Sequence, residues 1–471
     1  MTSIRPYRLS SLTLSLAFSV AVSASAVGMP WSGGEGGACR ANQPVPVPAH
    51  GSGVTAVMVA NAAVTAVPAN VADDPSAELS EPAPIDLALC LDTSSSMSGL
   101  IDAAKEKLWA IVNELGRASP RPILRVALLT YGNDGLSPEG GWVSLDVPFT
   151  EDLDLLAEHL FALTTNGGTE LVGRVVSVAH GQLDWSEAGP GLRMIVVAGN
   201  ESADQDQVVP ALSAVAGATR RDVVVNAIYC GNPEDEIAPG WRDVAIAGHG
   251  HFACIDKDNG TVHVETPFDG PMAELSSALN ATYLPYGQGG ARASSNQIAQ
   301  DSNAVGLNWA AAAERAITKC SDVYSCASWD LVDASRGADF ELADVAEADL
   351  PEALKDLSLE QRAAHLERLF AKRQVVQGQV NKLEAQRRAW LDDARAKGLL
   401  SDESAFDRAV RDALRAQAIA RGFSFAAQPE APGVDAATGL QPDPSAPAPL
   451  GFVGPPTRRA TGVAQGLSSD C

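Results

Sequence analysis

The chain has 471 residues, 46% of them apolar, and a mean hydropathy near zero, which is typical of a globular protein with one large core and accessory segments. Asp and Glu outnumber Lys and Arg by 58 to 34, so the formal net charge is −24. Nucleic acids and anionic lipid surfaces repel such a chain at long range, which excludes a general role in binding polyanions.

The first 26 residues have the pattern of a secretory signal peptide. Arg5 and Arg8 precede an uncharged run from Leu9 to Met29, and Ala24-Ser25-Ala26 offers an A-x-A cleavage site. We therefore expect an exported protein, either periplasmic or secreted. The run is also about long enough to span a bilayer. An uncleaved membrane anchor is thus the alternative, and only in that case do we expect contact with a membrane.

Residues 27–83 consist mainly of Gly, Ala, Pro and Val without a sustained period, so we expect a disordered, low-complexity linker. From 84 to about 285, apolar strand-like runs alternate with segments of helical period. This alternation predicts an α/β domain with a doubly wound, mostly parallel sheet that helices cover on both faces. Residues 142–147 (WVSLDV) alternate apolar and polar side chains, which predicts an edge or antiparallel strand.

The first strand-like run of this domain ends in a polar loop. Its last residue is Asp92, and the hydroxyls of Ser94 and Ser96 follow just before a helical pattern that begins at Leu100. Ligands of an open parallel α/β sheet bind outside the carboxyl ends of its strands, so these three side chains are candidates for a binding site. Oxygen ligands suit a hard divalent cation such as Mg²⁺ or Ca²⁺ rather than zinc.

The pattern Asp92-x-Ser94-x-Ser96 after an apolar strand resembles the metal-ion-dependent adhesion site (MIDAS) of the von Willebrand factor type A (VWA) family. Further along, Gly167-Gly168-Thr169 resembles the second MIDAS element, in which the Thr169 hydroxyl approaches the metal. An ordinary helix N-cap turn fits the same residues. We expect the helix that this turn opens to run to about Leu183.

The resemblance implies that the cation is Mg²⁺, Mn²⁺ or Ca²⁺ and that it is held partly through water. An acidic side chain of a protein partner would complete its coordination. In the family, the third MIDAS element is an aspartate that follows a strand. Here the strand-like run 193–198 leads into Gly199-Asn200-Glu201, and Gly199 stands in the aspartate's place by the simplest alignment. Either Asn200 or Glu201 replaces the aspartate through a small shift of the loop, or the site binds no metal.

The sequence pattern of residues 295–425 predicts a helical region. Ser358-Leu359-Glu360-Gln361 is a capping-box pattern that opens a long charged helix from 358 to about 397, and Gly398 separates it from a second helix at 402–421. The two helices predict a hairpin, which either folds back on the sheet domain or pairs with another chain. The first helix has a coiled-coil-like apolar seam that two arginines interrupt: Leu366, Leu369, Val376, Val380, Leu383 and Trp390, with Arg373 and Arg387.

The chain has seven cysteines, an odd count that leaves at least one of them unpaired within the chain. Cys320 and Cys326 can form a disulfide only if the helix breaks between them. Residues 426–471 are rich in Pro, Ala and Gly, and we expect a disordered tail. The order of a VWA-like domain followed by a charged helical region resembles that of bacterial exported VWA proteins.

These features predict an exported protein whose MIDAS-like site mediates protein–protein interaction through a divalent cation. The alternative is a metal-independent structural or assembly module that acts through the helical hairpin, and Gly199 favours this alternative. We expect no enzyme, because the sequence has no Gly-x-Ser-x-Gly elbow, no H-E-x-x-H and no P-loop.

Overall fold

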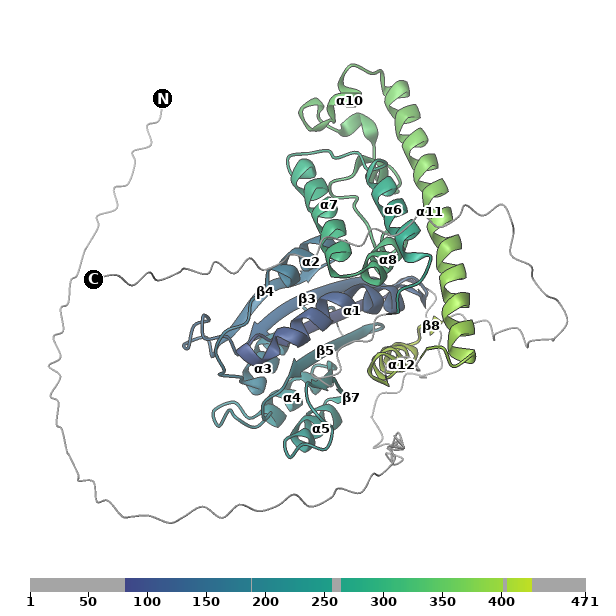
Figure 1. The fold of residues 1–471 in the computed structure, drawn as a ribbon. Coiled ribbons are helices and arrows are strands. Elements are labelled where there is room, and N and C mark those ends of the chain that lie inside the picture. The colour runs from purple at the N-terminus through teal and green to yellow at the C-terminus, as the bar shows by residue number, and fades with distance from the viewer. Residues whose placement is uncertain (1–80, 188, 256–263, 401–404, 426–471) are drawn as a thin grey trace, which may run out of the picture. The chain divides into compact units, whose positions relative to one another are not determined.

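The computed structural model describes residues 81–187, 189–255, 264–400 and 405–425 (Figure 1). The predicted signal peptide at 1–26, nearly all of the predicted linker at 27–83 and the predicted tail at 426–471 lie outside these ranges, so these remain predictions. Within the described ranges, none of the helices combines the length and the apolar character needed to cross a membrane.

Six strands form one sheet in the order β4-β3-β1-β5-β6-β7. β1 lies inside the sheet and pairs in parallel with β3 and β5, and β6 and β7 continue the parallel set. β4 pairs antiparallel with β3 at the other edge. The prediction of a mostly parallel sheet with an antiparallel edge strand is therefore confirmed. The bounds are β1 Pro84–Asp92, β3 Ile123–Tyr131, β4 Val143–Thr150, β5 Leu192–Gly199, β6 Val224–Tyr229 and β7 His249–Cys254.

The sheet is buried on both faces, and this accounts for its nearly continuous apolar strands. Successive side chains of a strand point to opposite faces, so Leu87 and Leu91 of β1 join one core cluster while Ala88 and Cys90 join the other. Helices α1 and α2 contribute to the first cluster, and α3, α4 and α5 to the second (Figure 1). Their bounds are α1 Ser98–Gly116, α2 Leu153–Ala162, α3 Val172–Gln182, α4 Ala211–Thr219 and α5 Ala238–Ala247.

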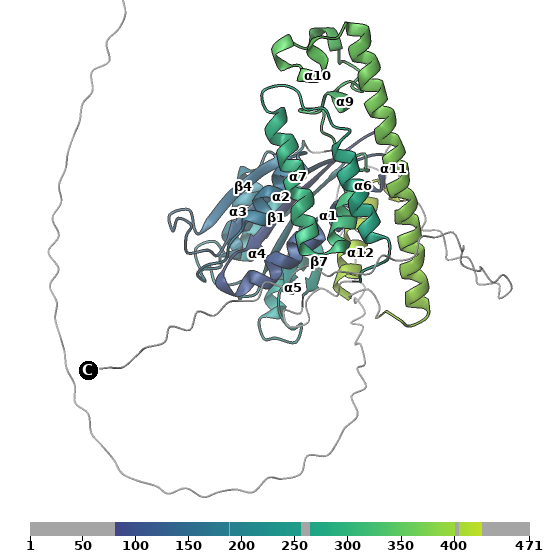
Figure 2. The same ribbon diagram turned by 45° about the horizontal axis from the view of Figure 1, so that its top comes forward.

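The helical region packs on the sheet domain. α8 lies against α1, α11 runs along α6 and α8, and α12 returns to contact α1 and the edge strand β7 (Figures 1 and 2). Two short strands, β2 (Ala118–Ser119) and β8 (Ser424–Phe425), pair beyond α12. The hairpin of α11 and α12 thus folds back on its own chain. The bounds are α6 Asp269–Asn280, α7 Gly290–Leu307, α8 Trp309–Thr318, α9 Leu331–Ala334, α10 Glu352–Lys355, α11 Leu359–Ala396 and α12 Ala405–Ile419.

The predicted capping box opens α11. The Ser358 hydroxyl accepts a hydrogen bond from the Gln361 backbone N–H, and the Gln361 side chain accepts one from the Ser358 N–H. Two N–H groups of the first turn, which have no partner inside a helix, are thereby satisfied.

The two arginines of the α11 seam form ion pairs with the chain's own acidic residues, and Arg373 is buried there. Arg373 Nη2 lies 2.9 Å from Asp330 Oδ2, and its guanidinium stacks 4.0 Å from the centre of the Tyr283 ring. Arg387 Nε lies 2.7 Å from Asp269 Oδ1, and its Nη1 lies 2.8 Å from Glu314 Oε1. The face that sequence patterning describes as coiled-coil-like therefore packs against α6, α8 and α9.

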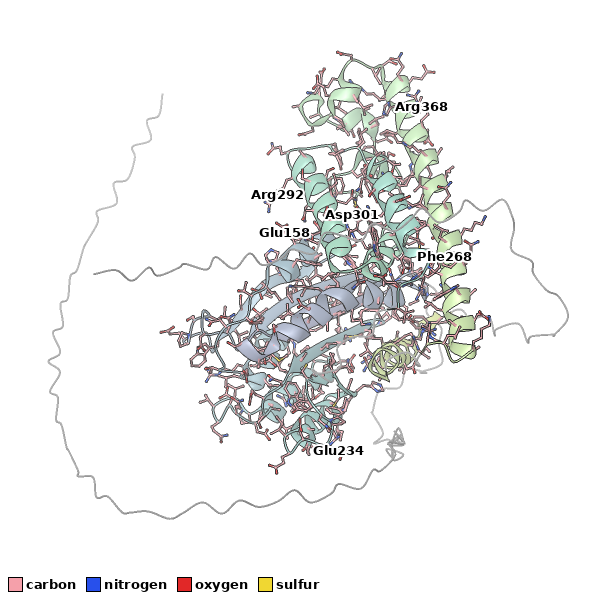
Figure 3. The ribbon with its side chains drawn as sticks, in the orientation of Figure 1. Glu158, Glu234, Phe268, Arg292, Asp301 and Arg368 are labelled. Atoms are coloured by element: carbon pink, nitrogen blue, oxygen red, sulfur yellow. The ribbon has the colours of Figure 1, made fainter. Side chains whose placement is uncertain are left out.

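A buried polar network around Asp301 of α7 ties the helical region to the sheet domain (Figure 3). Lys319 Nζ lies 2.8 Å from Asp301 Oδ2, and Arg315 Nε lies 3.0 Å from Asp301 Oδ1. Arg315 Nη2 also lies 2.6 Å from Asp154 Oδ1 on α2. Pairing offsets the cost of burying these charges, so the two regions are joined by specific polar contacts as well as by apolar packing.

The helix after the second motif begins later than the sequence predicts. α3 starts at Val172 because Thr169 forms an antiparallel bridge with Gly132. α4 starts at Ala211, directly after Pro210, because a proline disfavours helical backbone in the residue before it. Although α8 ends at Thr318, before Cys320 and Cys326, both cysteines are free thiols.

Candidate cation site at the carboxyl edge of the sheet

Asp92, the last residue of β1, is fully buried at the edge where the parallel strands end. Its Oδ1 accepts a 2.7 Å hydrogen bond from the Ser94 N–H, whereas its Oδ2 is buried without a partner among the described residues. Burial raises the pKa of Asp92 to about 7, and the nearby charges of Glu170 and Glu201 add to the rise against the opposing hydrogen bonds from Ser94. An ionised Asp92 therefore lies in a buried setting where the neighbouring charges of Glu170 and Glu201 oppose its own.

The two serine hydroxyls lie together beside this carboxylate. Ser94 Oγ is buried and lies 3.1 Å from Ser96 Oγ, while Ser96 is exposed. A 3₁₀ turn at Ser95–Met97 links β1 to α1 and brings the two hydroxyls onto the same side of the loop. The three residues of the first predicted motif thus form one cluster of oxygen atoms.

Backbone hydrogen bonds join the second predicted loop to the first. The Ser95 N–H donates to the Gly167 carbonyl at 3.0 Å, and the Asn166 N–H donates to the Thr93 carbonyl at 3.0 Å. Gly167 has a φ of 77°, a left-handed conformation that favours glycine. Thr169 is half-buried, and its bridge to Gly132 places it at the edge where Asp92 lies.

Glu170 is a second buried carboxylate at this edge, and sequence patterning missed it. Only 4% of the residue is exposed, and its Oε2 is buried without a partner in the part of the chain that the structure describes. A Cβ added at Gly132 would lie 2.6 Å from Asp92 Oδ1 and 2.9 Å from Glu170 Cγ. Asp92 Oδ1 and Glu170 Cγ are therefore at most 5.5 Å apart, which is the sum of these two distances.

The electrostatics of Glu170 parallel those of Asp92. Burial raises the pKa of Glu170, the Ser94 hydroxyl partly offsets this rise, and the charge of Glu201 adds to it. Ser94 therefore lowers the pKa of both carboxylates. In the sequence, Glu170 is only an acidic residue between the Gly-Gly-Thr turn and an apolar helix. Its burial could not be predicted, because it depends on Gly132 from another part of the sheet.

Gly199 ends β5 beside Asp92, in the place where the resemblance implies an aspartate. A Cβ here would lie 2.5 Å from Tyr131 Oη and 3.1 Å from Trp241 Cη2. The Tyr131 hydroxyl is held in position by a 3.0 Å hydrogen bond to the Ala198 carbonyl. Two aromatic side chains thus fill the space that an aspartate would need.

The two predicted replacements for that aspartate differ in position. Asn200 Nδ2 lies 3.0 Å from Ser96 Oγ, so its side chain reaches the hydroxyl cluster. Glu201 is exposed, and its backbone carbonyl accepts a 2.8 Å hydrogen bond from Trp241 Nε1. The Glu201 carboxylate acts on Asp92 and Glu170 through its charge, because it raises the pKa of both.

The chemistry of these groups fits a hard divalent cation. Two buried carboxylate oxygens without partners lie beside hydroxyl and amide oxygens, the ligands that Mg²⁺, Mn²⁺ and Ca²⁺ accept. Among the described residues, no three His, Cys, Asp or Glu side chains are placed to hold a metal ion by themselves. A cation here would therefore need hydroxyl groups and water as further ligands.

No family model and no curated protein matches the sequence. Among solved structures, the chain is similar to proximal thread matrix protein 1 from the mussel byssus with a zinc-occupied MIDAS motif, at 15% identity over 40% of this chain and 43% of that chain, with a TM-score of 0.31. A von Willebrand factor type A protein from Catenulispora acidiphila matches at 16% identity over 37% and 40% of the two chains, with a TM-score of 0.29.

The vWF domain of the type V pili tip protein Mfa5 from Porphyromonas gingivalis matches at 13% identity over 37% of this chain and 90% of that domain, with a TM-score of 0.29. The match spans less than half of the mussel and Catenulispora chains. These are likenesses of fold alone. By its own strand order and by the loops that meet at its carboxyl edge, the sheet domain of this chain has a VWA-like fold.

Proposed function

We propose that this chain is an exported binding protein that captures a divalent cation at the carboxyl edge of its sheet and, through that cation, an acidic side chain of a protein partner. The observation that carries the proposal is that Asp92 Oδ2 and Glu170 Oε2 are both buried without a partner in the described part of the chain, at the edge where the Ser94 and Ser96 hydroxyls lie. Unpaired buried carboxylates cost free energy, and a bound cation removes that cost.

Each residue has a distinct part in this proposal. Asp92 offers a full negative charge at the end of β1, directly or through water, and Ser94 and Ser96 offer neutral oxygens. Thr169 and Asn200 border the same cluster from the second and third loops. The exposed Ser96 leaves an approach from solvent, through which a partner's carboxylate would complete the coordination of the cation.

Export and the absence of catalysis belong to the same proposal. Support for export comes from the arginines, the apolar run and the A-x-A site within the first 29 residues. A site built to present a cation to a protein ligand needs no nucleophile paired with a base, and the sequence offers no such motif.

The test is a calorimetric titration of Mg²⁺ or Mn²⁺ into the full chain and into Asp92→Ala. Saturable binding that disappears in Asp92→Ala is expected, with the fold unchanged by circular dichroism. Asp102→Ala is the matched control, because it removes an exposed carboxylate of α1 that pairs with Lys105 at 3.6 Å. If Asp92→Ala binds the cation as the wild type does, the proposed site is wrong.

One observation favours the metal-independent alternative. Val375 lies on α11, in the helical hairpin, and is 63% exposed, so an apolar side chain is available there for a partner. Deletion of 358–422 would be a poor test, because it removes Arg373 and Val380 from the core. Val375→Glu is sharper: it spares the fold, and the alternative predicts that it abolishes association in the absence of any cation.

A further inference from the structure

A site with one carboxylate would leave half of a divalent cation's charge without compensation. This edge of the sheet holds a second carboxylate, Glu170. It lies in the second loop, directly after Thr169, but is not one of the residues that the MIDAS resemblance names. Its Oε2 is buried without a partner among the described residues, as is Asp92 Oδ2. Two buried side chains with unused acceptor atoms at one edge indicate a shared positive ligand.

We infer that Glu170 is the second carboxylate of the cation site and that it takes over the charge that the missing aspartate at Gly199 would have supplied. The inference rests on the proposed function, since it requires that a cation binds. It assigns the missing charge to a residue of the second loop and not to Asn200-Glu201 of the third.

The geometry supports Glu170 in two ways. Its Cγ and Asp92 Oδ1 both lie within 3 Å of the point where Gly132 would carry a Cβ, so that glycine leaves the two side chains room to meet. Glu170 is only 4% exposed, which sets it apart from the solvated Glu201.

The third loop is a poor source of this charge. The aromatic side chains of Tyr131 and Trp241 fill the space beside Gly199, and Trp241 Nε1 fixes the Glu201 carbonyl at 2.8 Å. Asn200 reaches Ser96 but carries no charge. The loop is therefore held in its present path and offers one neutral side chain to the cluster.

The assignment predicts two effects of opposite sign for Glu170→Gln in the full chain. Without a cation, the variant removes like-charge repulsion at a buried position, so its Tm should rise by about 2 °C or more. With Mg²⁺ or Mn²⁺, its affinity should fall by about tenfold or more, because a charged ligand becomes neutral. A merely structural role for Glu170 would lower both the Tm and the affinity.

The experiment measures Mg²⁺ and Mn²⁺ affinity by calorimetry and the Tm in EDTA for the wild type and three variants. Glu201→Gln is the matched control, since it makes the same chemical change beside the same site. The affinity of this variant for Mg²⁺ or Mn²⁺ should differ from that of the wild type by no more than about twofold, because Glu201 is a screened surface charge. Glu170→Asp keeps the carboxylate and should bind the cation more tightly than Glu170→Gln.

The outcomes separate this inference from the proposed function. Wild-type affinity in Glu170→Gln, or a larger loss in Glu201→Gln than in Glu170→Gln, would overturn the inference while leaving cation binding in place. A fall of both Tm and affinity in Glu170→Gln, with no recovery in Glu170→Asp, would also overturn it. If the wild type shows no binding and no stabilisation by either cation, the proposed function itself fails.

Discussion

The hydroxyl of Tyr131 lies 2.5 Å from the point at which a side chain on Gly199 would begin. Tyr131 ends β3 and Gly199 ends β5, on either side of β1, so the contact crosses the carboxyl edge of the sheet just where Asp92 lies. The space in which an aspartate at position 199 would lie is therefore filled by Tyr131 and Trp241.

Gly199→Asp is accordingly expected to destabilise the protein by about 1–3 kcal/mol, because the added side chain overpacks a filled space. Thermal unfolding measures the loss. Tyr131→Phe in the same chain removes the nearest atom and should recover part of it. Gly289→Asp is the control, since a Cβ there meets no atom within 4 Å. Equal stability of Gly199→Asp and wild type would refute the account of this loop.

The raised pKa of Asp92 predicts opposite pH dependences with and without a cation. The pKa of Asp92 is about 7 in the folded protein, above the ordinary aspartate value of 3.8, so between these values the folded state holds more protons. The stabilisation from this group is therefore complete below the ordinary pKa and is lost as the pH rises toward 7. A cation binds the ionised form, so stabilisation by Mg²⁺ should grow over the same range.

The comparison of wild type with Asp92→Asn isolates this effect from other titrating groups. The difference between their Tm values is measured in EDTA and in Mg²⁺, at about pH 5 and at about pH 8. These two pH values lie below and above the pKa of Asp92, which is about 7. In EDTA the wild type should lose stability relative to the variant as the pH rises, and in Mg²⁺ it should gain. A difference independent of pH in both buffers would contradict the burial of an unpaired carboxylate.

The hydroxyl of Ser94 predicts a graded loss of cation affinity. Ser94→Ala removes a neutral oxygen that contacts Ser96 and acts on both carboxylates, so affinity should fall by about tenfold and remain measurable. Ser95→Ala is a close control, because Ser95 is the exposed residue between the two hydroxyls. Calorimetry that finds equal affinities for the two variants would remove Ser94 from the site.

Arg373 is expected to hold α11 in place. Arg373→Met leaves Asp330 without its buried partner, and such a loss typically costs about 3–5 kcal/mol. Arg368→Met is the control, because Arg368 lies on an exposed face of the same helix (Figure 3). Chemical denaturation compares the two. A small effect of Arg373→Met, similar to that of Arg368→Met, would mean that apolar packing alone anchors the helix.

The sheet and the first motif could be predicted from sequence because their signals are local. A buried parallel strand needs a continuous apolar run, and β1 has one that ends at Asp92. The capping box at Ser358 is likewise a pattern of adjacent residues. Such signals fix element type and the ends of strands without knowledge of tertiary contacts.

The remaining features depend on contacts between distant segments. Glu170 looks like a solvated charge in sequence, and only its position beside Gly132 and Asp92 buries it. Arg373 looks like an interruption of an apolar seam, and its role follows from Asp330 on another element. α8 and α11 pack on α1 and α6, so a fragment that contains the sheet domain alone would lose these contacts, and experiments on the site require the full chain.

Titration of Mg²⁺ into the full chain, with Asp92→Ala beside it, tests the central claim most directly. The account predicts saturable binding and a raised Tm for the wild type, and neither effect for Asp92→Ala. Binding that persists in Asp92→Ala, or a wild type whose heat and Tm do not respond to millimolar Mg²⁺ or Mn²⁺, would contradict a cation site at this edge of the sheet.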